Sequence, residues 1–186
     1  LWKFLKKKFY IQNLENFILS YIHPNAKIAE TATIDPFTTI YGDVEIGEGS
    51  WIGSHVTIMD GARIGKNCKI FPGAVISGIP QDLKYKNEKT TAEIGDNCVI
   101  RECVTINRGT THSNTTRIGK NCLIMAYVHL GHDTIVGENV IIANSCNLGG
   151  HVIIEDWAIL GGNINVQQFT RIGAHSYISG GISINK

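Results

Sequence analysis

The chain of 186 residues has little that would mark a nucleic-acid or membrane protein. Its 17 basic and 16 acidic residues leave a net charge of +1, whereas a nucleic-acid-binding protein usually carries a strong basic excess. No apolar run approaches the length of about 18 residues that a membrane-spanning helix needs. Proline is rare, with 4 residues, and glycine is common, with 20. Together with abundant isoleucine, this composition predicts an all-β chain.

A period of six residues runs along the chain. Isoleucine recurs at every sixth position from Ile22 to Ile76, and large apolar residues resume the same phase at Ile94 and at Ile118. Neither an α-helix nor a simple strand has this period, so the pattern predicts a coil with a turn in each repeat. Two interruptions, residues 77–93 and 107–117, hold the positions in this phase that are not Ile, Leu or Val: Asp82, Glu88 and His112.

A second column of smaller residues follows each large apolar residue by four positions, as at Ala26, Thr38 and Ala74. We expect both columns to point into a narrow prism. Glycine often directly follows the large residue, as at Gly47, Gly131 and Gly173. At these glycines we expect a positive φ or a close approach of two backbones.

The cysteines follow the same repeat. Four of the five occupy the small inward position, namely Cys68, Cys98, Cys122 and Cys146. This placement indicates core packing rather than metal ligation or disulfides, since a buried free cysteine behaves as a small hydrophobe. Free thiols of this kind suit a reducing, cytoplasmic environment.

Residues 1–21 stand outside the repeat and form a basic, amphipathic segment. Its apolar residues fall on one face of a predicted short helix, which either caps the repeat domain or lies on a membrane surface. Any membrane contact is therefore expected to be peripheral. Residues 22–186 form the predicted repeat domain. Because the chain begins with Leu1 and stops inside a repeat, it has the character of a fragment.

The period-six pattern resembles that of the hexapeptide-repeat transferases. The resemblance implies a left-handed parallel β-helix, in which three hexapeptides form one triangular coil of 18 residues. It also implies a homotrimer with active sites between subunits. The two interruptions are then loops leaving the coils, and long loops in a compact fold are usually functional or disordered.

The segment MAYVHLGHD, residues 125–133, raises three alternatives: a metal site, a catalytic base with its partner, or a polar corner. In the repeat phase His129 and His132 point away from the core. In coils of 18 residues Asp133 lies against His151, and His132 lies against Gly150. These polar groups gather along one edge, a composition typical of an active site.

A catalytic base fits this segment better than a metal does. Zinc needs three or four converging ligands, and the histidine spacing of the zinc-binding γ-carbonic anhydrases is absent, so we expect no metal. A neutral imidazole can take a hydroxyl proton, and an adjacent carboxylate fixes its tautomer. His132 and Asp133 supply these groups. Gly150 leaves a backbone N–H uncovered, as an oxyanion site requires. A solvated polar edge remains the alternative.

Several motifs together resemble the UDP-N-acetylglucosamine acyltransferases that begin lipid A biosynthesis. They are IPQDLKY at 79–85, IRECVTINRG at 100–109, the histidine segment, LGGHV at 148–152 and QQFTRIGAH at 167–175. The resemblance implies transfer of a 3-hydroxyacyl chain from the phosphopantetheine thioester of acyl carrier protein to the glucosamine 3-hydroxyl of UDP-N-acetylglucosamine. It implies no metal and no redox cofactor.

The resemblance also implies a role for each matching residue. His132 matches the general base, Asp133 its partner, and Gly150 the backbone donor that faces the thioester carbonyl. Gly180 matches the residue that limits acyl length, and glycine there implies a long chain. The positions that match substrate contacts are Gln81, Asp82, Lys84, His129, His151, Gln168 and Gln167, the last standing where the family usually has histidine.

One departure keeps other activities open. The family has a C-terminal helical region that helps to bind the nucleotide, and this sequence has no counterpart of it. The alternatives are the related N-acyltransferase of the same pathway, a CoA-dependent acetyltransferase of the same fold, and a truncated solenoid without turnover. The short segment before the repeat speaks against the first, and the QDLKY loop speaks against the second.

Overall fold

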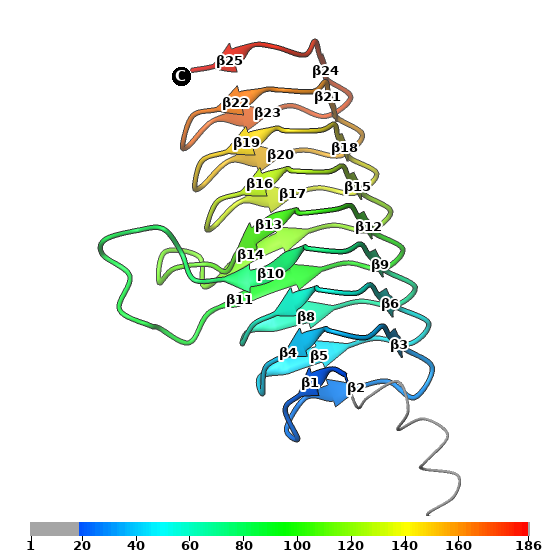
Figure 1. The fold of residues 1–186 in the computed structure, drawn as a ribbon. Coiled ribbons are helices and arrows are strands. Elements are labelled where there is room, and N and C mark those ends of the chain that lie inside the picture. Colours follow the sequence, from blue (N-terminus) through cyan, green and yellow to red (C-terminus); the bar gives the residue numbers. More distant parts are fainter. Residues whose placement is uncertain (1–18, 186) are drawn as a thin grey trace, which may run out of the picture.

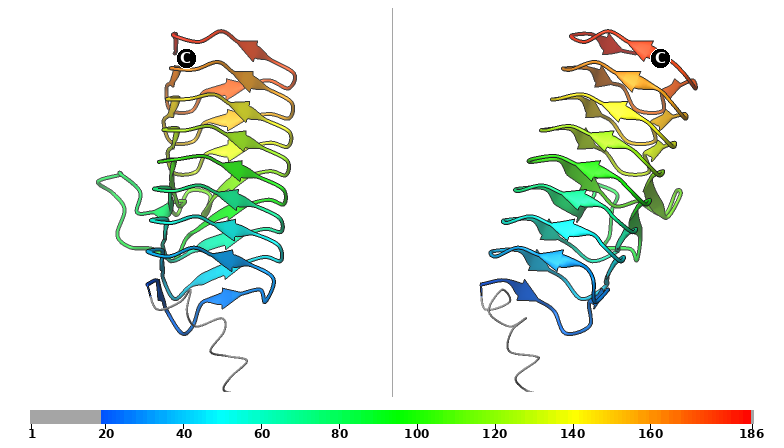
Figure 2. Two further views of the ribbon diagram at one scale, coloured as in Figure 1. Left: turned by 45° about the vertical axis from the view of Figure 1, so that its right-hand side comes forward. Right: turned by 90° about the vertical axis from the view of Figure 1, so that its right-hand side faces the viewer.

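The computed structural model describes residues 19–185, and every regular element in this part of the chain is a β-strand (Figure 1). The strands pair in parallel and form three sheets of nine, eight and eight strands. Successive strands pass from one sheet to the next, so three strands and three corners complete one turn of a prism (Figure 2). The predicted left-handed parallel β-helix is confirmed.

The three sheets are named A, B and C in the order in which the chain visits them. Sheet A contains β1 (Tyr21–Ile22), β4 (Thr39–Ile40), β7 (Thr57–Ile58), β10 (Val75–Gly78), β13 (Thr105–Asn107), β16 (His129–Leu130), β19 (Asn147–Leu148), β22 (Asn165–Val166) and β25 (Ser183–Ile184). Sheet B contains β2 (Lys27–Ile28), β5 (Val44–Ile46), β8 (Ala62–Ile64), β11 (Thr91–Ile94), β14 (Thr115–Ile118), β17 (Ile135–Val136), β20 (Ile153–Ile154) and β23 (Arg171–Ile172). Sheet C contains β3 (Thr33–Ile34), β6 (Trp51–Ile52), β9 (Lys69–Ile70), β12 (Val99–Ile100), β15 (Leu123–Ile124), β18 (Ile141–Ile142), β21 (Ile159–Leu160) and β24 (Tyr177–Ile178).

The core is the interior of the prism, filled by the two predicted columns. The large column is buried throughout most of its length, and Ile40, Ile70 and Leu130 have no exposed surface. Burying one such side chain contributes roughly 1.5–3 kcal/mol of transfer free energy. The small column is equally buried, and it includes the four cysteines predicted to be core residues, while Cys103 is exposed. Periodicity therefore identified the core correctly.

The corners show which of the two expected reasons accounts for the glycine that directly follows the large residue. Positive φ occurs mainly three residues after the large apolar residue, as at Phe37, Asp133 and His151, and at none of the glycines that directly follow it. The predicted close backbone approach does occur at two of the glycines that follow the large residue. A Cβ on Gly47 would meet the backbone of Gly65 at 2.6 Å, and one on Gly131 would meet the backbone nitrogen of Gly150 at 2.8 Å. Glycine is required there because neighbouring coils stack closely, and not because the residue has a positive φ.

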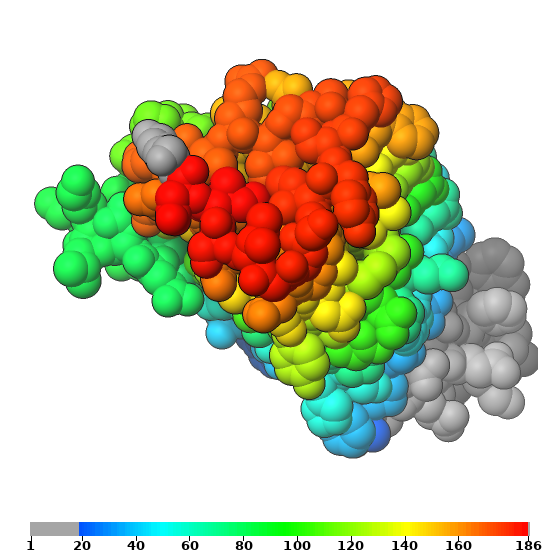
Figure 3. Space-filling view, turned by 90° about the horizontal axis from the view of Figure 1, so that it is seen from above, coloured from blue at the N-terminus to red at the C-terminus, as the bar shows by residue number. Residues whose placement is uncertain are grey.

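Both interruptions of the repeat are loops on the same edge of the prism. Residues 79–90 connect β10 to β11, and residues 108–114 connect β13 to β14, so both leave the corner between sheets A and B in adjacent coils (Figure 1). Seen along the stack, the first loop stands out from the side of the molecule (Figure 3). The histidine segment turns at the same edge, because β16 and β17 also belong to sheets A and B.

The predicted helix within residues 1–21 lies almost entirely outside the described residues. Between residues 19 and 185 no helix is long and apolar enough to cross a bilayer.

Candidate active site

A pocket of about 320 Å³ lies on the outer face of sheet A, beside the corner that carries both loops. Its floor is formed by three successive coils, at β16, β19 and β22, and the first loop contributes Gln81 to its wall. The residues that line it are Gln81, Asn107, His129, Gly131, His132, Asn147, Leu148, Gly149, Gly150, Asn165, Val166 and Gln168. The stacking register predicted from the 18-residue coil holds, because His129 pairs with Asn147 and Asn147 with Asn165.

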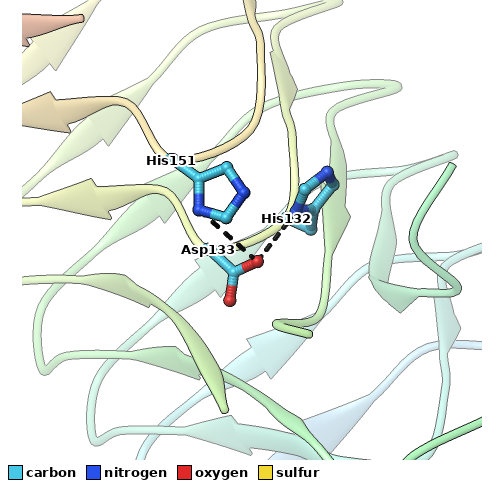
Figure 4. Close-up of side chains that lie close together, drawn as sticks. All are labelled: His132, Asp133 and His151. Atoms are coloured by element: carbon cyan, nitrogen blue, oxygen red, sulfur yellow. Dashed lines mark hydrogen bonds and ion pairs between the residues drawn. The ribbon is translucent and has the colours of Figure 1, made fainter. Parts of the chain in front are cut away.

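His132 and Asp133 form a hydrogen-bonded pair at the edge of this pocket (Figure 4). The His132 Nδ1 donates to Asp133 Oδ2 over 2.8 Å. Since a carboxylate can only accept, this bond places the proton of the neutral ring on Nδ1 and leaves Nε2 with a free lone pair. The His132 side chain points away from the core, as predicted, but it is only 9% exposed. Its neighbours enclose it, so it is not a solvated edge residue.

Gly150 makes room for the His132 ring. A Cβ at this position would lie 2.6 Å from Cε1 and 2.7 Å from Nε2 of His132, closer than real Cβ contacts allow. The Gly150 N–H donates to no acceptor within residues 19–185. Gly150, whose N–H is available, therefore packs directly against the His132 ring, as the stacking of 18-residue coils predicted.

Asp133 is fixed by residues of the second loop. It sits at a corner with φ of 58°, a conformation that Asp tolerates better than most residues. Its side chain is 1% exposed, yet its carboxylate accepts hydrogen bonds from Thr110, Ser113 and His132. Burial alone raises the pKa of this carboxyl, but the hydrogen bonds from Ser113, Thr110 and His132 outweigh it and hold the pKa far below the usual Asp range. Asp133 is therefore an anion at neutral pH.

The two neighbouring histidines are favoured in their neutral forms. Burial lowers the pKa of His129, whose Nδ1 lies 2.7 Å from Thr105 Oγ1. Burial also lowers the pKa of His151, whose Nδ1 lies 3.8 Å from Asp133 Oδ2. His151 stacks on Phe169 with ring centroids 4.3 Å apart. These histidines can contact a ligand without adding positive charge to the pocket.

The first loop places its three predicted contact residues differently. Gln81 lines the pocket. Asp82 forms a turn within the loop, because its Oδ1 accepts from the Lys84 N–H at 2.9 Å and its carbonyl accepts from the Tyr85 N–H. The Asp82 charge also acts to raise the pKa of His151. Lys84 is exposed. Only Gln81 of the three contributes to the pocket of a single chain.

Two of the predicted residues, Gln167 and Gly180, lie outside this pocket of one chain. Gln168 lines the pocket, whereas Gln167 is exposed and does not. Gly180 follows β24 of sheet C and packs against Gly162, at the corner between sheets C and A. It lies on a different edge of the prism from His132.

Sequence reasoning missed the residues of the second loop that contact the dyad. Thr110 and Ser113 bind the Asp133 side chain, and Thr116 accepts the Asp133 N–H at 2.8 Å. His112 packs edge-on against His151. The run GTTHSNTT, within the second interruption of the repeat, is rich in hydroxyl side chains and could have indicated hydrogen-bond donors near the site. Which hydroxyls reach the carboxylate depends on the path of the loop, which periodicity does not give.

His132, Asp133 and His151 are also the one group of possible metal ligands within residues 19–185, with ligand atoms within 4.8 Å of one another. A carboxylate has about four lone-pair sites, and those of Asp133 are already occupied by donors from Thr110, Ser113 and His132. A metal ion would have to break these bonds. The arrangement fits an acid–base pair better than a metal site.

The chain is similar to one known family and to curated proteins that share a single name. The family described as Bacterial transferase hexapeptide (six repeats) matches residues 25–58, 43–78 and 115–150. The acyl-[acyl-carrier-protein]–UDP-N-acetylglucosamine O-acyltransferase of Chlorobaculum parvum is 51% identical over 101 residues, which cover 51% of this chain and 38% of that protein.

Two solved structures extend the likeness over most of the chain. The UDP-N-acetylglucosamine acyltransferase of Francisella novicida is 45% identical with a TM-score of 0.89, over 90% of this chain and 62% of that one. The enzyme of the same name from Campylobacter jejuni is 37% identical with a TM-score of 0.79, over 89% of this chain and 67% of that one. The chain therefore spans less than two thirds of the Chlorobaculum and Francisella proteins.

Proposed function

The chain belongs to the UDP-N-acetylglucosamine acyltransferase family of hexapeptide-repeat proteins, and from this premise we propose that it catalyses the first acyl transfer of lipid A biosynthesis. The donor is a 3-hydroxyacyl chain on acyl carrier protein, and the acceptor is the glucosamine 3-hydroxyl of UDP-N-acetylglucosamine. The observation that carries the proposal is the His132–Asp133 pair, with the His132 ring packed against Gly150 at a pocket.

The geometry supports a general-base mechanism. His132 Nε2 takes the proton of the sugar 3-hydroxyl as the sugar oxygen attacks the thioester carbonyl carbon. The anionic Asp133 stabilises the imidazolium that forms. The Gly150 N–H donates to the oxyanion of the tetrahedral intermediate. When the intermediate collapses, the carbon–sulfur bond breaks, and the phosphopantetheine thiolate leaves with the proton held by His132. No metal or redox cofactor takes part.

The pocket has the polar groups that an acceptor sugar requires. Gln81, Asn107 and Gln168 line it with amide groups that both donate and accept hydrogen bonds. We assign the sugar to this region, with Gln81, Asp82 and Lys84 of the first loop, together with His129 and His151, as its contacts. Gln167 and Gly180, which lie outside the pocket of one chain, act from a neighbouring subunit in the proposed trimer, and there Gly180 leaves space for a long acyl chain.

The activity is tested by incubating the purified protein with 3-hydroxyacyl-acyl carrier protein and UDP-N-acetylglucosamine. We expect one equivalent of free carrier thiol for each acylated nucleotide, with mass spectrometry and NMR locating the ester on the 3-oxygen. An amide product from the corresponding 3-amino sugar, formed faster than the ester, would favour the N-acyltransferase instead. Thiol release without acylated nucleotide would exclude both activities.

A homotrimer is supported by the outer faces of the prism. The outward column of sheet C is apolar from Val99 to Tyr177, whereas that of sheet B carries ion pairs such as Arg117–Glu93. Trimer formation would cover the apolar column and place a second subunit beside the pocket. We also propose a cytoplasmic location, which the five free cysteines and the proposed donor support.

We predict that Ile159→Glu dissociates the trimer and Ile135→Glu does not. The two side chains are 38% and 40% exposed and lie on sheets C and B respectively. Burying one carboxylate in each copy of an apolar interface costs several kcal/mol, whereas a carboxylate on sheet B stays in water. Light scattering at micromolar concentration measures the mass. A stable monomer of the unmodified protein, or equal dissociation by both variants, would contradict this assignment.

Chelation is expected to leave the activity unchanged. The proposed base is an imidazole, and the bonds of Asp133 leave no lone pair for zinc. Transfer rates before and after dialysis against EDTA should agree within experimental error. Loss of transfer that zinc restores would instead show that His132, Asp133 and His151 hold a metal.

A further inference from the structure

The second loop, residues 108–114, has no hydrogen bond or ring contact with the proposed base His132, but it holds the partner of that base, Asp133. We propose that Thr110 and Ser113 are positioning residues that fix the tautomer and orientation of His132 through the carboxylate of Asp133. This inference rests on the proposed function, because it assigns those two hydroxyl residues a part in the same general-base mechanism.

Four donors from the loop reach the Asp133 carboxylate. Oδ1 accepts from the Thr110 N–H at 2.9 Å, the Ser113 N–H at 3.3 Å and the Ser113 hydroxyl at 2.5 Å. Oδ2 accepts from the Thr110 hydroxyl at 2.7 Å and from His132 Nδ1 at 2.8 Å. The loop therefore binds both oxygens, and the orientation of the carboxylate plane is set by it.

The same segment also holds the backbone of Asp133. Thr116, at the start of the next coil, accepts the Asp133 N–H at 2.8 Å through its hydroxyl. The Asp133 side chain is 1% exposed, so water cannot replace a lost donor without entering the buried corner. A carboxylate freed from Thr110 or Ser113 could rotate about its terminal torsion, which is a soft coordinate.

Rotation of Asp133 would affect the chemistry at the other end of the imidazole. The Asp133 Oδ2 is the acceptor that keeps the proton on His132 Nδ1. Without it the neutral ring can carry its proton on Nε2, the atom that must accept the sugar proton. A base in that tautomer is inactive even when its ring stays in place. The loop hydroxyls thus act on turnover without touching the substrate.

The test combines four variants. Ser113→Ala and Thr110→Val each remove one hydroxyl donor, while Thr110→Val keeps the side-chain shape and the backbone donor. Ser113→Thr retains a hydroxyl and serves as the conservative rescue. Thr111→Ala is the matched control, because Thr111 is exposed in the same loop and makes no hydrogen bond to Asp133.

The measurements are the steady-state constants of each variant and the ¹⁵N chemical shifts of its His132 ring. We expect kcat to fall about tenfold in each of Ser113→Ala and Thr110→Val, the scale of one hydrogen bond to a charged group. KM should change by less than about twofold, since no substrate contact is lost. Ser113→Thr should recover most of the loss, and Thr111→Ala should behave as the unmodified protein. The ¹⁵N shifts of the His132 ring should show Nδ1–H in the unmodified protein and mixed tautomers in the two hydroxyl-deleted variants.

The spectroscopic arm separates this inference from the proposed function, because it needs no substrate. If the protein transfers no acyl chain but the tautomer mixes in the variants, the positioning role stands and the assigned reaction fails. If Ser113→Ala and Thr110→Val keep the Nδ1–H tautomer, the positioning role is overturned whatever the activity. A rise in KM at constant kcat would likewise overturn it and make the hydroxyls substrate contacts.

Discussion

Replacing His132 by alanine is expected to lower kcat by about 10²–10⁴-fold, the usual contribution of a general base. The variant loses the Nε2 lone pair of the ring that packs against Gly150, while the rest of the pocket keeps its lining. Because the acceptor should still bind, KM for UDP-N-acetylglucosamine should change much less than kcat. Steady-state transfer from 3-hydroxyacyl-acyl carrier protein measures both.

A matched histidine provides the control. His175 stacks on Trp157 at the corner between sheets B and C, away from the pocket. His175→Ala should keep the transfer rate of the unmodified protein. The His132 side chain is enclosed, so thermal unfolding of His132→Ala must be measured alongside. A folded His132→Ala protein with nearly full activity would remove His132 from the mechanism.

Gly150→Ala is expected to lower kcat by about 10²–10³-fold, the scale of losing an oxyanion donor. Its Cβ would lie 2.6 Å from Cε1 and 2.7 Å from Nε2 of His132. One of the two must move, so the base and the backbone donor lose their relative placement. In a His132→Ala background the added methyl has no ring to displace. There the loss from Gly150→Ala should shrink, as expected for coupled sites.

Gly162 offers the comparison for this change. It follows β21 as Gly150 follows β19, two residues after the large inward side chain. The nearest atom to a Cβ on Gly162 is the Asn144 carbonyl oxygen at 3.3 Å, a contact that small shifts relieve. Gly162→Ala should therefore remain folded and active. If both alanine variants lose activity equally, distortion of the coil rather than displacement of His132 explains the loss at Gly150.

The repeat predicted the fold because one physical constraint recurs in every coil. Only a large and a small apolar side chain fit inside each side of the prism. The size and place in the repeat of Ile40, Val56 and Cys98 therefore predict that their side chains point inward, where they are buried. The 18-residue stacking alone then predicts that His132 lies against Gly150 and Asp133 against His151. Both neighbours are found in contact.

What periodicity could not give lies where the repeat is broken. The burial of His132 and the anchoring of Asp133 depend on loop 108–114, whose path follows from local turns rather than from the coil. Which of the two expected reasons applies to the glycines could not be predicted either. The glycines after Ile46 and Leu130 are required because the backbone of the neighbouring coil lies too close for a Cβ. The positive φ of the turn falls instead at residues such as Asp133 and His151, which tolerate left-handed backbone.

The most direct test is a structure of the protein with UDP-N-acetylglucosamine bound. The account predicts the sugar in the pocket between Gln81 and the coils of β16, β19 and β22, with its 3-hydroxyl oxygen within about 3.2 Å of His132 Nε2. The Nδ1 of His132 should still donate to Asp133. A nucleotide bound elsewhere, or bound in this pocket with another hydroxyl at Nε2 and the 3-hydroxyl facing away, would contradict the assignment of His132 as the base.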